Sequence, residues 1–134
     1  MVYQPVEANI GEPVASLAVA ALAKGRAYVV VGGERGTVQL LDLQNGHAVG
    51  DGWRAHPGAV VAVVAGRLAA GRVAIFTAGQ DPLVHAWDAS TGEPVGAALP
   101  VPGAVHAMAY QPELASLVIG GTGVAVACLR QGRN

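Results

Sequence analysis

The amino-acid sequence predicts an all-β protein that is built from repeated antiparallel units of four strands. Its apolar runs are short, rich in valine and bounded by Gly, Pro, Asn or Asp, which is typical of strands joined by tight turns. The segment LDLQNGHAVG at 41–50 also matches WDASTGEPVG at 87–96, with an offset of 46 residues (87 − 41). No segment shows sustained helical periodicity, so we expect strands throughout the repeat.

The repeat places the strands in order along the chain. The runs AYVVVGGERGTVQL at 27–40 and VAIFTAGQDPLVHA at 73–86 share the offset, and a weaker third copy reads ASLVIGGTGVAVACL at 115–129. Each copy contains apolar runs around Gly-containing turns, which predicts hairpins. The expected strands are 14–21, 27–33, 37–43 and 47–54, then 59–65, 72–78, 83–88 and 94–100, then 104–110, 115–120 and 123–129. The units cover 13–55, 56–101 and 102–134, after an outer strand within 1–12.

The order of strands within a unit follows from hydrophobicity and proline. The runs at 16–22, 59–66 and 105–110 are nearly continuous in apolar residues, as expected of innermost strands covered on both faces. Pro5, Pro94 and Pro100 fall in the segments expected to be outermost, where a missing backbone N–H is tolerated. Each unit therefore runs from an inner first strand to an outer last strand.

The second unit resembles a WD40 repeat. Ala-His at 55–56 is similar to the family's Gly-His pair, TAGQD at 77–81 to its Ser-Gly-Ser-x-Asp turn, and Trp-Asp at 87–88 to the dipeptide that names it. The resemblance implies a β-propeller, with about three four-stranded antiparallel blades in this chain. It also implies a buried structural hydrogen-bond network within the second blade, formed by His56, Thr77, Asp81 and Trp87.

The other two units depart from the family pattern. In the first, Arg35 stands where the turn Asp is expected and Leu41 where the Trp is expected. The third has a shorter turn at 120–123 and lacks the His, Asp and Trp. We therefore expect those blades to be held by apolar packing and backbone ladders alone.

Three blades do not close a propeller, which needs about 4 to 8. The third blade has residues for three strands only, while 2–8 has the character of an outer strand without a blade of its own. We expect ring closure by oligomerisation, with the N-terminal strand of one copy completing the third blade of the next in a dimer or trimer. The alternative is that the chain is the C-terminal part of a larger WD40 protein.

The composition of the chain limits the classes of partner that it is expected to bind. Charged residues are 13% of the chain and the net charge is −1, so there is no basic surface for nucleic acid. No apolar run reaches the roughly 18 residues of a membrane span. The lone Cys128 is expected to be a buried small hydrophobe, without a disulfide. We expect a cytoplasmic protein without cofactor or metal, from a GC-rich bacterial genome because the chain has a single lysine, Lys24.

His, Asp and a hydroxyl in the second unit superficially suggest a catalytic triad, but their positions in the repeat favour a structural role, so we expect no enzyme. His106 lies on an inner strand, where symmetric copies would converge on a channel and offer a metal or anion site as a lesser alternative. Asp42 and Asp88 are expected to accept hydrogen bonds from turn amides. The glycine-rich segment at 32–36 reads as a hairpin turn rather than a phosphate loop.

The functional expectation is a protein-interaction scaffold, as the family resemblance implies. Trp and Arg are favoured in binding hot spots, so Trp53 and Arg54 lead the candidates, although Trp53 fits equally well between two blades. The alternative is a propeller that binds a small ligand or carbohydrate, against which the 4% aromatic content argues. The full set of partner-binding candidates on loops and turns is Trp53, Arg54, Glu34, Arg35, Gln80 and His85.

Overall fold

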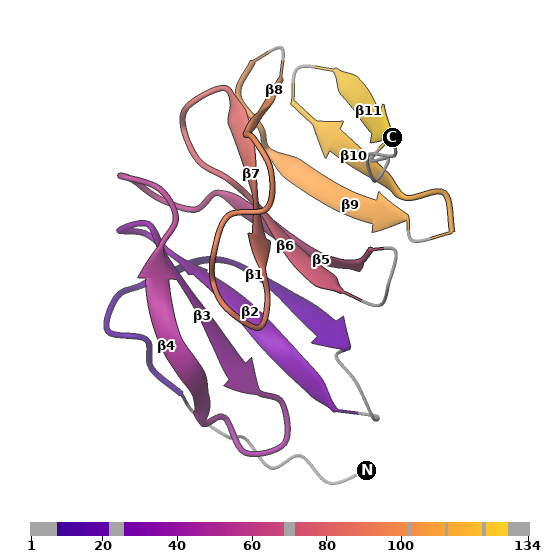
Figure 1. The fold of residues 1–134 in the computed structure, drawn as a ribbon. Coiled ribbons are helices and arrows are strands. Elements are labelled where there is room, and N and C mark those ends of the chain that lie inside the picture. The colour runs from indigo at the N-terminus through magenta and orange to yellow at the C-terminus, as the bar shows by residue number, and fades with distance from the viewer. Residues whose placement is uncertain are drawn as a thin grey trace, which may run out of the picture.

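The computed structural model describes residues 8–21, 26–68, 72–101, 103–111, 113–121 and 123–128. Within these ranges the chain forms strands, turns and loops without a helix, and the strands build three separate antiparallel sheets (Figure 1). The all-β prediction is confirmed. In the described part of the chain, no helix has the length and apolar character needed to cross a membrane.

Each sheet is a meander of strands that are consecutive in the sequence. The first sheet has the order β1-β2-β3-β4, the second β5-β6-β7-β8 and the third β11-β10-β9. The strands are β1 (Val14–Ala21), β2 (Ala27–Gly33), β3 (Thr37–Asp42), β4 (Ala48–Arg54), β5 (Ala62–Arg67), β6 (Val73–Ala78), β7 (Leu83–Asp88), β8 (Leu99–Pro100), β9 (Ala107–Gln111), β10 (Ser116–Gly120) and β11 (Val124–Cys128). Every one of them overlaps a strand that the sequence predicts.

The outer strand of the second sheet is much shorter than predicted. Instead of 94–100, β8 contains only Leu99–Pro100, and Pro94 makes a single isolated bridge to Trp87. Pro94 and Pro100 have no N–H to donate to the ladder, which limits pairing at this edge. The N-terminal outer strand predicted at 2–8 lies outside the described residues, apart from residue 8.

The three sheets lie side by side in the order of the sequence (Figure 1). Their first strands lie side by side, because β5 contacts β1 on one side and β9 on the other. Later strands of each sheet lie progressively further out, as in the predicted order from inner to outer. The described residues therefore form three successive sheets around a line of inner strands, and no closed ring is seen among them.

Two apolar layers hold the sheets together. Between the first and second sheets, Val30, Leu40 and Ile75 belong to one buried cluster. Between the second and third sheets, Phe76 and Leu117 belong to another. Alternating side chains along β6 supply both layers, because neighbouring residues of a strand point to opposite faces. The second sheet is consequently buried on both sides.

The first and third sheets are each covered on one face only. Leu17 and Val19 of β1 are 63% and 60% exposed, and Val124 and Val126 of β11 are 78% and 65% exposed. The expectation that all inner strands are covered on both faces is thus wrong for β1 and for β9, in which exposed residues alternate with partly buried ones. Cys128, at the end of β11, is exposed rather than buried, because its side of the third sheet has no neighbouring sheet among the described residues.

Candidate functional site

The site begins with His56, which lies in the loop from the first sheet to the second. A hairpin turn of the first sheet holds the loop, since the amides of Ala55 and His56 donate to the Gly36 carbonyl at 2.8 and 3.3 Å. Gly36 has φ +98°, and a Cβ there would collide with the His56 carbonyl oxygen. Glycine is therefore required at the turn that carries His56 into the second sheet.

Thr77 and Trp87 lie on β6 and β7, on the face of the second sheet that is turned toward the first. His56 Nε2 lies 2.9 Å from Thr77 Oγ1, and the Trp87 indole N–H donates to the same oxygen at 2.9 Å. Thr77 is fully buried and His56 is 3% exposed. Three of the four residues in the network implied by the WD40 resemblance are therefore joined by hydrogen bonds.

Asp81, the fourth residue, lies beside the network without a hydrogen bond to it. Its Oδ1 is 3.6 Å from His56 Nδ1, and its Oδ2 is 3.9 Å from His85 Nε2. Both separations exceed hydrogen-bonding distance. His85 comes close because its backbone lies opposite Thr77 in the β6–β7 ladder, so both side chains share one face. The repeat pattern alone gave no sign of this histidine's place.

Burial sets the charge of the site. Removal from water lowers the pKa of His56, the neighbouring His85 lowers it further, and Asp81 opposes both. The neutral imidazole is consequently favoured in the folded protein. Its Nδ1 is buried and has no hydrogen-bond partner among the described residues.

The first sheet has apolar residues at the matching positions. With the 46-residue offset, Val31 corresponds to Thr77 and Leu41 to Trp87. Val31 is buried without any hydroxyl to accept a bond from a neighbour. The expectation that the first unit lacks the polar network agrees with this packing.

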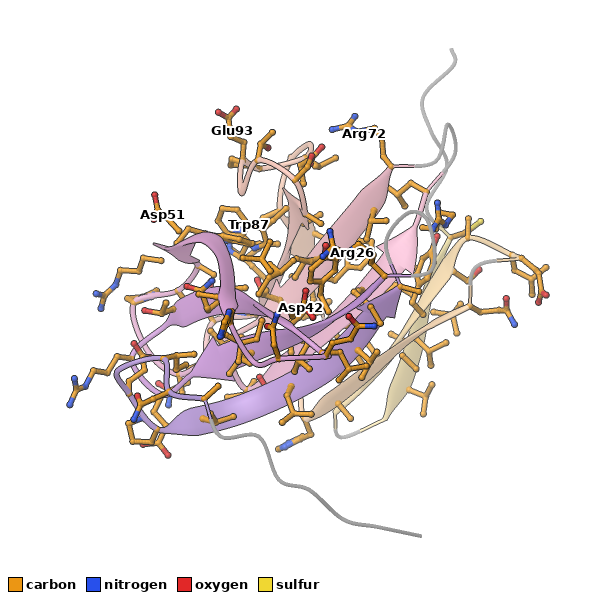
Figure 2. The ribbon with its side chains drawn as sticks, turned by 90° about the horizontal axis from the view of Figure 1, so that it is seen from below. Arg26, Asp42, Asp51, Arg72, Trp87 and Glu93 are labelled. Atoms are coloured by element: carbon orange, nitrogen blue, oxygen red, sulfur yellow. The ribbon has the colours of Figure 1, made fainter. Side chains whose placement is uncertain are left out.

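Both Asp42 and Asp88 accept turn amides, as predicted. Asp42 Oδ1 receives the Gln44 amide and Asp88 Oδ1 the Ser90 amide, each at 2.8 Å. Sequence reasoning missed the arginines that accompany them: Arg26 is 3.6 Å from Asp42, and Arg72 donates to Asp88 at 2.7 Å. Figure 2 shows Arg26 beside Asp42.

The signal for these arginines was present in the sequence, because Arg26 and Arg72 are themselves 46 residues apart. The hydrogen bond from the Ser90 hydroxyl, followed by that from Arg72, lowers the pKa of Asp88 to about 2. Arg26 and Arg72 therefore make corresponding charged contacts with the turn aspartates of the first and second sheets.

The predicted partner-binding residues separate into two groups. Trp53 is half-buried between the first two sheets, with its ring centroid 6.1 Å from that of Trp87 and its Nε1 buried. This placement matches the second of the two roles that the sequence left open for Trp53. His85 is half-buried, and the exposed members of the set are Glu34, Arg35, Arg54 and Gln80.

Comparison of the chain with models of known protein families and with curated proteins finds no match. The likeness to WD40 repeats accordingly rests on residues 55–56, 77–81 and 87–88 and on the contacts that they make. Its implications for function remain proposals.

Proposed function

We propose that this chain is a non-catalytic interaction scaffold that assembles head to tail with copies of itself into a closed β-propeller of the WD40 type. The observation that supports this proposal is the pair of uncovered apolar faces on the first and third sheets. Large exposed apolar surfaces are unusual on a protein that acts as a monomer. Each face therefore needs a partner surface.

The free face of the first sheet is apolar across three strands. Leu17 pairs with Val31, which is itself buried, and Val19 pairs with Val29, which pairs in turn with Leu41. Residues paired in this way present their side chains on the same face. The face contains no charged side chain at these positions, so a cover of matching apolar character would stabilise it by removing this area from water.

The free face of the third sheet has the same character. Val118 pairs with Val126 on one side and with Ala109 on the other, and Gly120 pairs with Val124. Val124 and Val126 are the most exposed large apolar residues of β11. This face is opposite to the one that carries Leu117 against the second sheet.

The two free faces correspond to surfaces that already pack inside the chain. Leu17 is the repeat counterpart of Val63, which is buried against the first sheet. Val118 lies between Leu117 and Ile119 and faces away from the second sheet, just as Phe76 faces away from the first. A contact between the third sheet of one copy and the first sheet of the next would therefore repeat an existing interface. Such head-to-tail contacts generate a closed ring when the rotation from one copy to the next closes, as it does between the blades of a propeller.

The non-catalytic part of the proposal is supported by the burial of the polar network. Among the described residues, Thr77 carries the only hydroxyl bonded to His56 and is fully buried, so it is not placed to attack a substrate. The exposed turns that surround the network instead offer both charges for contact with another protein, through Glu34, Arg35 and Arg54.

The test is the mass of the full chain in solution. A monomer has a mass of 13.4 kDa, so a dimer would have 2 × 13.4 = 26.8 kDa and a trimer 3 × 13.4 = 40.2 kDa. We expect light scattering to give one of the two larger values. Leu17→Asp should shift the mass to that of the monomer, because it places a charge on the free face of the first sheet.

The matched control is Leu114→Asp, since Leu114 is 70% exposed in the turn between β9 and β10, outside the strands that form the two faces. This variant should keep the mass of the wild type. A wild-type chain that stays monomeric at roughly 100 μM would contradict self-assembly, because ring interfaces of standard size give far tighter association. An unchanged mass for Leu17→Asp would contradict the head-to-tail arrangement.

A further inference from the structure

Three potential metal ligands converge beside the polar network. His56, Asp81 and His85 each contribute one nitrogen or oxygen atom, and these atoms lie within 4.8 Å of one another. The closest pairs are His56 Nδ1 with Asp81 Oδ1 at 3.6 Å and His85 Nε2 with Asp81 Oδ2 at 3.9 Å. Ligands of a tetrahedral zinc ion, each about 2.1 Å from the metal, lie roughly 3.4 Å apart. Small side-chain rotations would therefore bring these atoms into position.

The buried Nδ1 of His56 is the second sign of a ligand. The His56 side chain is 1% exposed, and Nδ1 has no hydrogen-bond partner among the described residues. A buried polar atom without a partner is costly. The nitrogen lies 3.6 Å from Asp81 Oδ1, so a cation bound by both atoms would satisfy it.

Thr77 orients His56 in the way that metal-binding histidines need. The Thr77 hydroxyl oxygen lies 2.9 Å from Nε2 and can accept its proton in a hydrogen bond. With the proton on Nε2, the lone pair of the neutral ring is on Nδ1. Metal ligands of this type usually donate their second N–H to a nearby oxygen, which fixes both tautomer and orientation.

The surroundings leave room for an ion and a route from solvent. A Cβ on Gly79 would lie 2.7 Å from His56 Nδ1, so the glycine keeps the space beside this nitrogen free. Asp81 and His85 are 39% and 31% exposed and connect the buried nitrogen to the surface. The His56 and His85 rings have centroids 5.0 Å apart in a T-shaped contact, and the carboxylate lies within 4 Å of a nitrogen of each ring.

We propose that His56 Nδ1, the Asp81 carboxylate and His85 Nε2 bind a divalent zinc-like cation, with water completing a four-coordinate site. Two imidazoles and one carboxylate are a ligand set that zinc accepts in proteins. The site joins the loop that carries His56 to the β6–β7 turn. Bound metal therefore links the loop between the first and second sheets to the second sheet and stabilises the folded chain.

The competing arrangement is a direct hydrogen bond from His56 Nδ1–H to Asp81 without metal. Such a bond should measure about 2.8 Å, so it requires a larger approach of the two atoms from 3.6 Å than the roughly 3.4 Å between two ligands of zinc. The two arrangements also differ in His85, which contributes nothing to the direct bond and is a ligand in the metal site. Substitution of His85 consequently separates them.

The experiment uses the full chain without a polyhistidine tag, stripped of metal with a chelator and titrated with Zn²⁺ by calorimetry. We expect one Zn²⁺ per chain, a rise in Tm on saturation, and for Co²⁺ the intense visible absorption of a tetrahedral site. His85→Gln should weaken Zn²⁺ binding by at least about tenfold, because it removes one of three protein ligands. At the same Zn²⁺ concentration it should also give a smaller rise in Tm than the wild type.

The matched control is His47→Gln, which makes the same change at an exposed histidine in a turn of the first sheet. It should bind Zn²⁺ like the wild type. Absence of saturable binding up to about 100 μM Zn²⁺ would overturn the proposal, as a three-ligand protein site is expected to bind more tightly than this. Equal binding by His85→Gln and the wild type would overturn it as well. The mass of the assembly is measured separately, so these outcomes are independent of ring closure.

Discussion

The first and second sheets present the same positions of the repeat in opposite environments. Leu17 of the first sheet is 63% exposed, whereas its counterpart Val63 in the second sheet is 5% exposed. Val63 is buried because the first sheet packs over it, and no sheet among the described residues packs over Leu17. The comparison shows that the exposed residue of the first sheet is as apolar as its buried counterpart in the second sheet.

The chemistry of the two sheets also differs on this face. The second sheet has Thr77 and Trp87 in a hydrogen-bonded network with His56, and the first has Val31 and Leu41. The backbone ladders of the two sheets are nevertheless closely similar. Strand pairing is thus compatible with either polar or apolar side chains on this face. The polar network adds directional contacts to the interface between the first and second sheets.

The largest expected effect is the loss of a core side chain from the second sheet. Ile75 is fully buried, so Ile75→Ala should lower the free energy of unfolding by about 3 kcal/mol through lost burial and the cavity left behind. Its repeat counterpart is Val29, which is only half-buried. Val29→Ala should cost about 1 kcal/mol in urea unfolding at low protein concentration. Equal losses would show that the two faces are equally covered.

The next largest loss of stability is expected when a residue of the polar network is replaced by its apolar counterpart from the first sheet. Thr77→Val introduces the residue found at the matching position, Val31, and leaves the Trp87 and His56 nitrogens without their partner. We expect a loss of about 2 kcal/mol, since buried polar groups would be left unpaired. Thr77→Ser keeps the hydroxyl and should cost less. The proposed role of the network would be contradicted if Val were tolerated as well as Ser.

A smaller effect should distinguish the two Arg–Asp contacts. Asp88→Asn removes charged hydrogen bonds to Arg72 and Ser90 and should cost about 1 kcal/mol at pH 7. Asp42→Asn should cost less, because Arg26 is 3.6 Å away and 65% exposed. The pKa of Asp88 is lowered from 3.8 to about 2. Its contribution is therefore present above pH 3.8 and is lost as the pH falls toward 2, so wild type and Asp88→Asn should converge there.

The smallest expected effect is a dependence of stability on pH through His56. Burial lowers the pKa of this side chain from 6.5, so the unfolded chain binds a proton more readily than the folded one. Stability should therefore decrease as the pH falls through 6.5 toward the folded-state pKa. Asp81 and His85 both lie close to the same ring. His56→Gln should flatten the slope between pH 7 and pH 5, while His47→Gln should leave it unchanged.

Much of the strand pattern was predictable, since apolar runs and turn residues report local geometry. The structure confirms strands at all eleven predicted positions between residues 14 and 129 that it describes. The repeat pattern also brought His56, Thr77 and Trp87 to the same site. It could not show that His85 joins them, because that depends on the register of β6 with β7. Nor did hydrophobicity reveal the exposure of Cys128, which depends on the neighbour of β11.

The sequence by itself determined the local elements of this protein: which segments are strands, where they turn, and which residues repeat every 46 positions. These properties depend on neighbours along the chain, through the alternation of side chains and the conformations of glycine and proline. Only the tertiary structure decided which apolar faces are covered and brought Asp81 close to both His56 and His85. Burial and side-chain convergence depend on the packing of one sheet on the next, which alternation along a single strand does not specify.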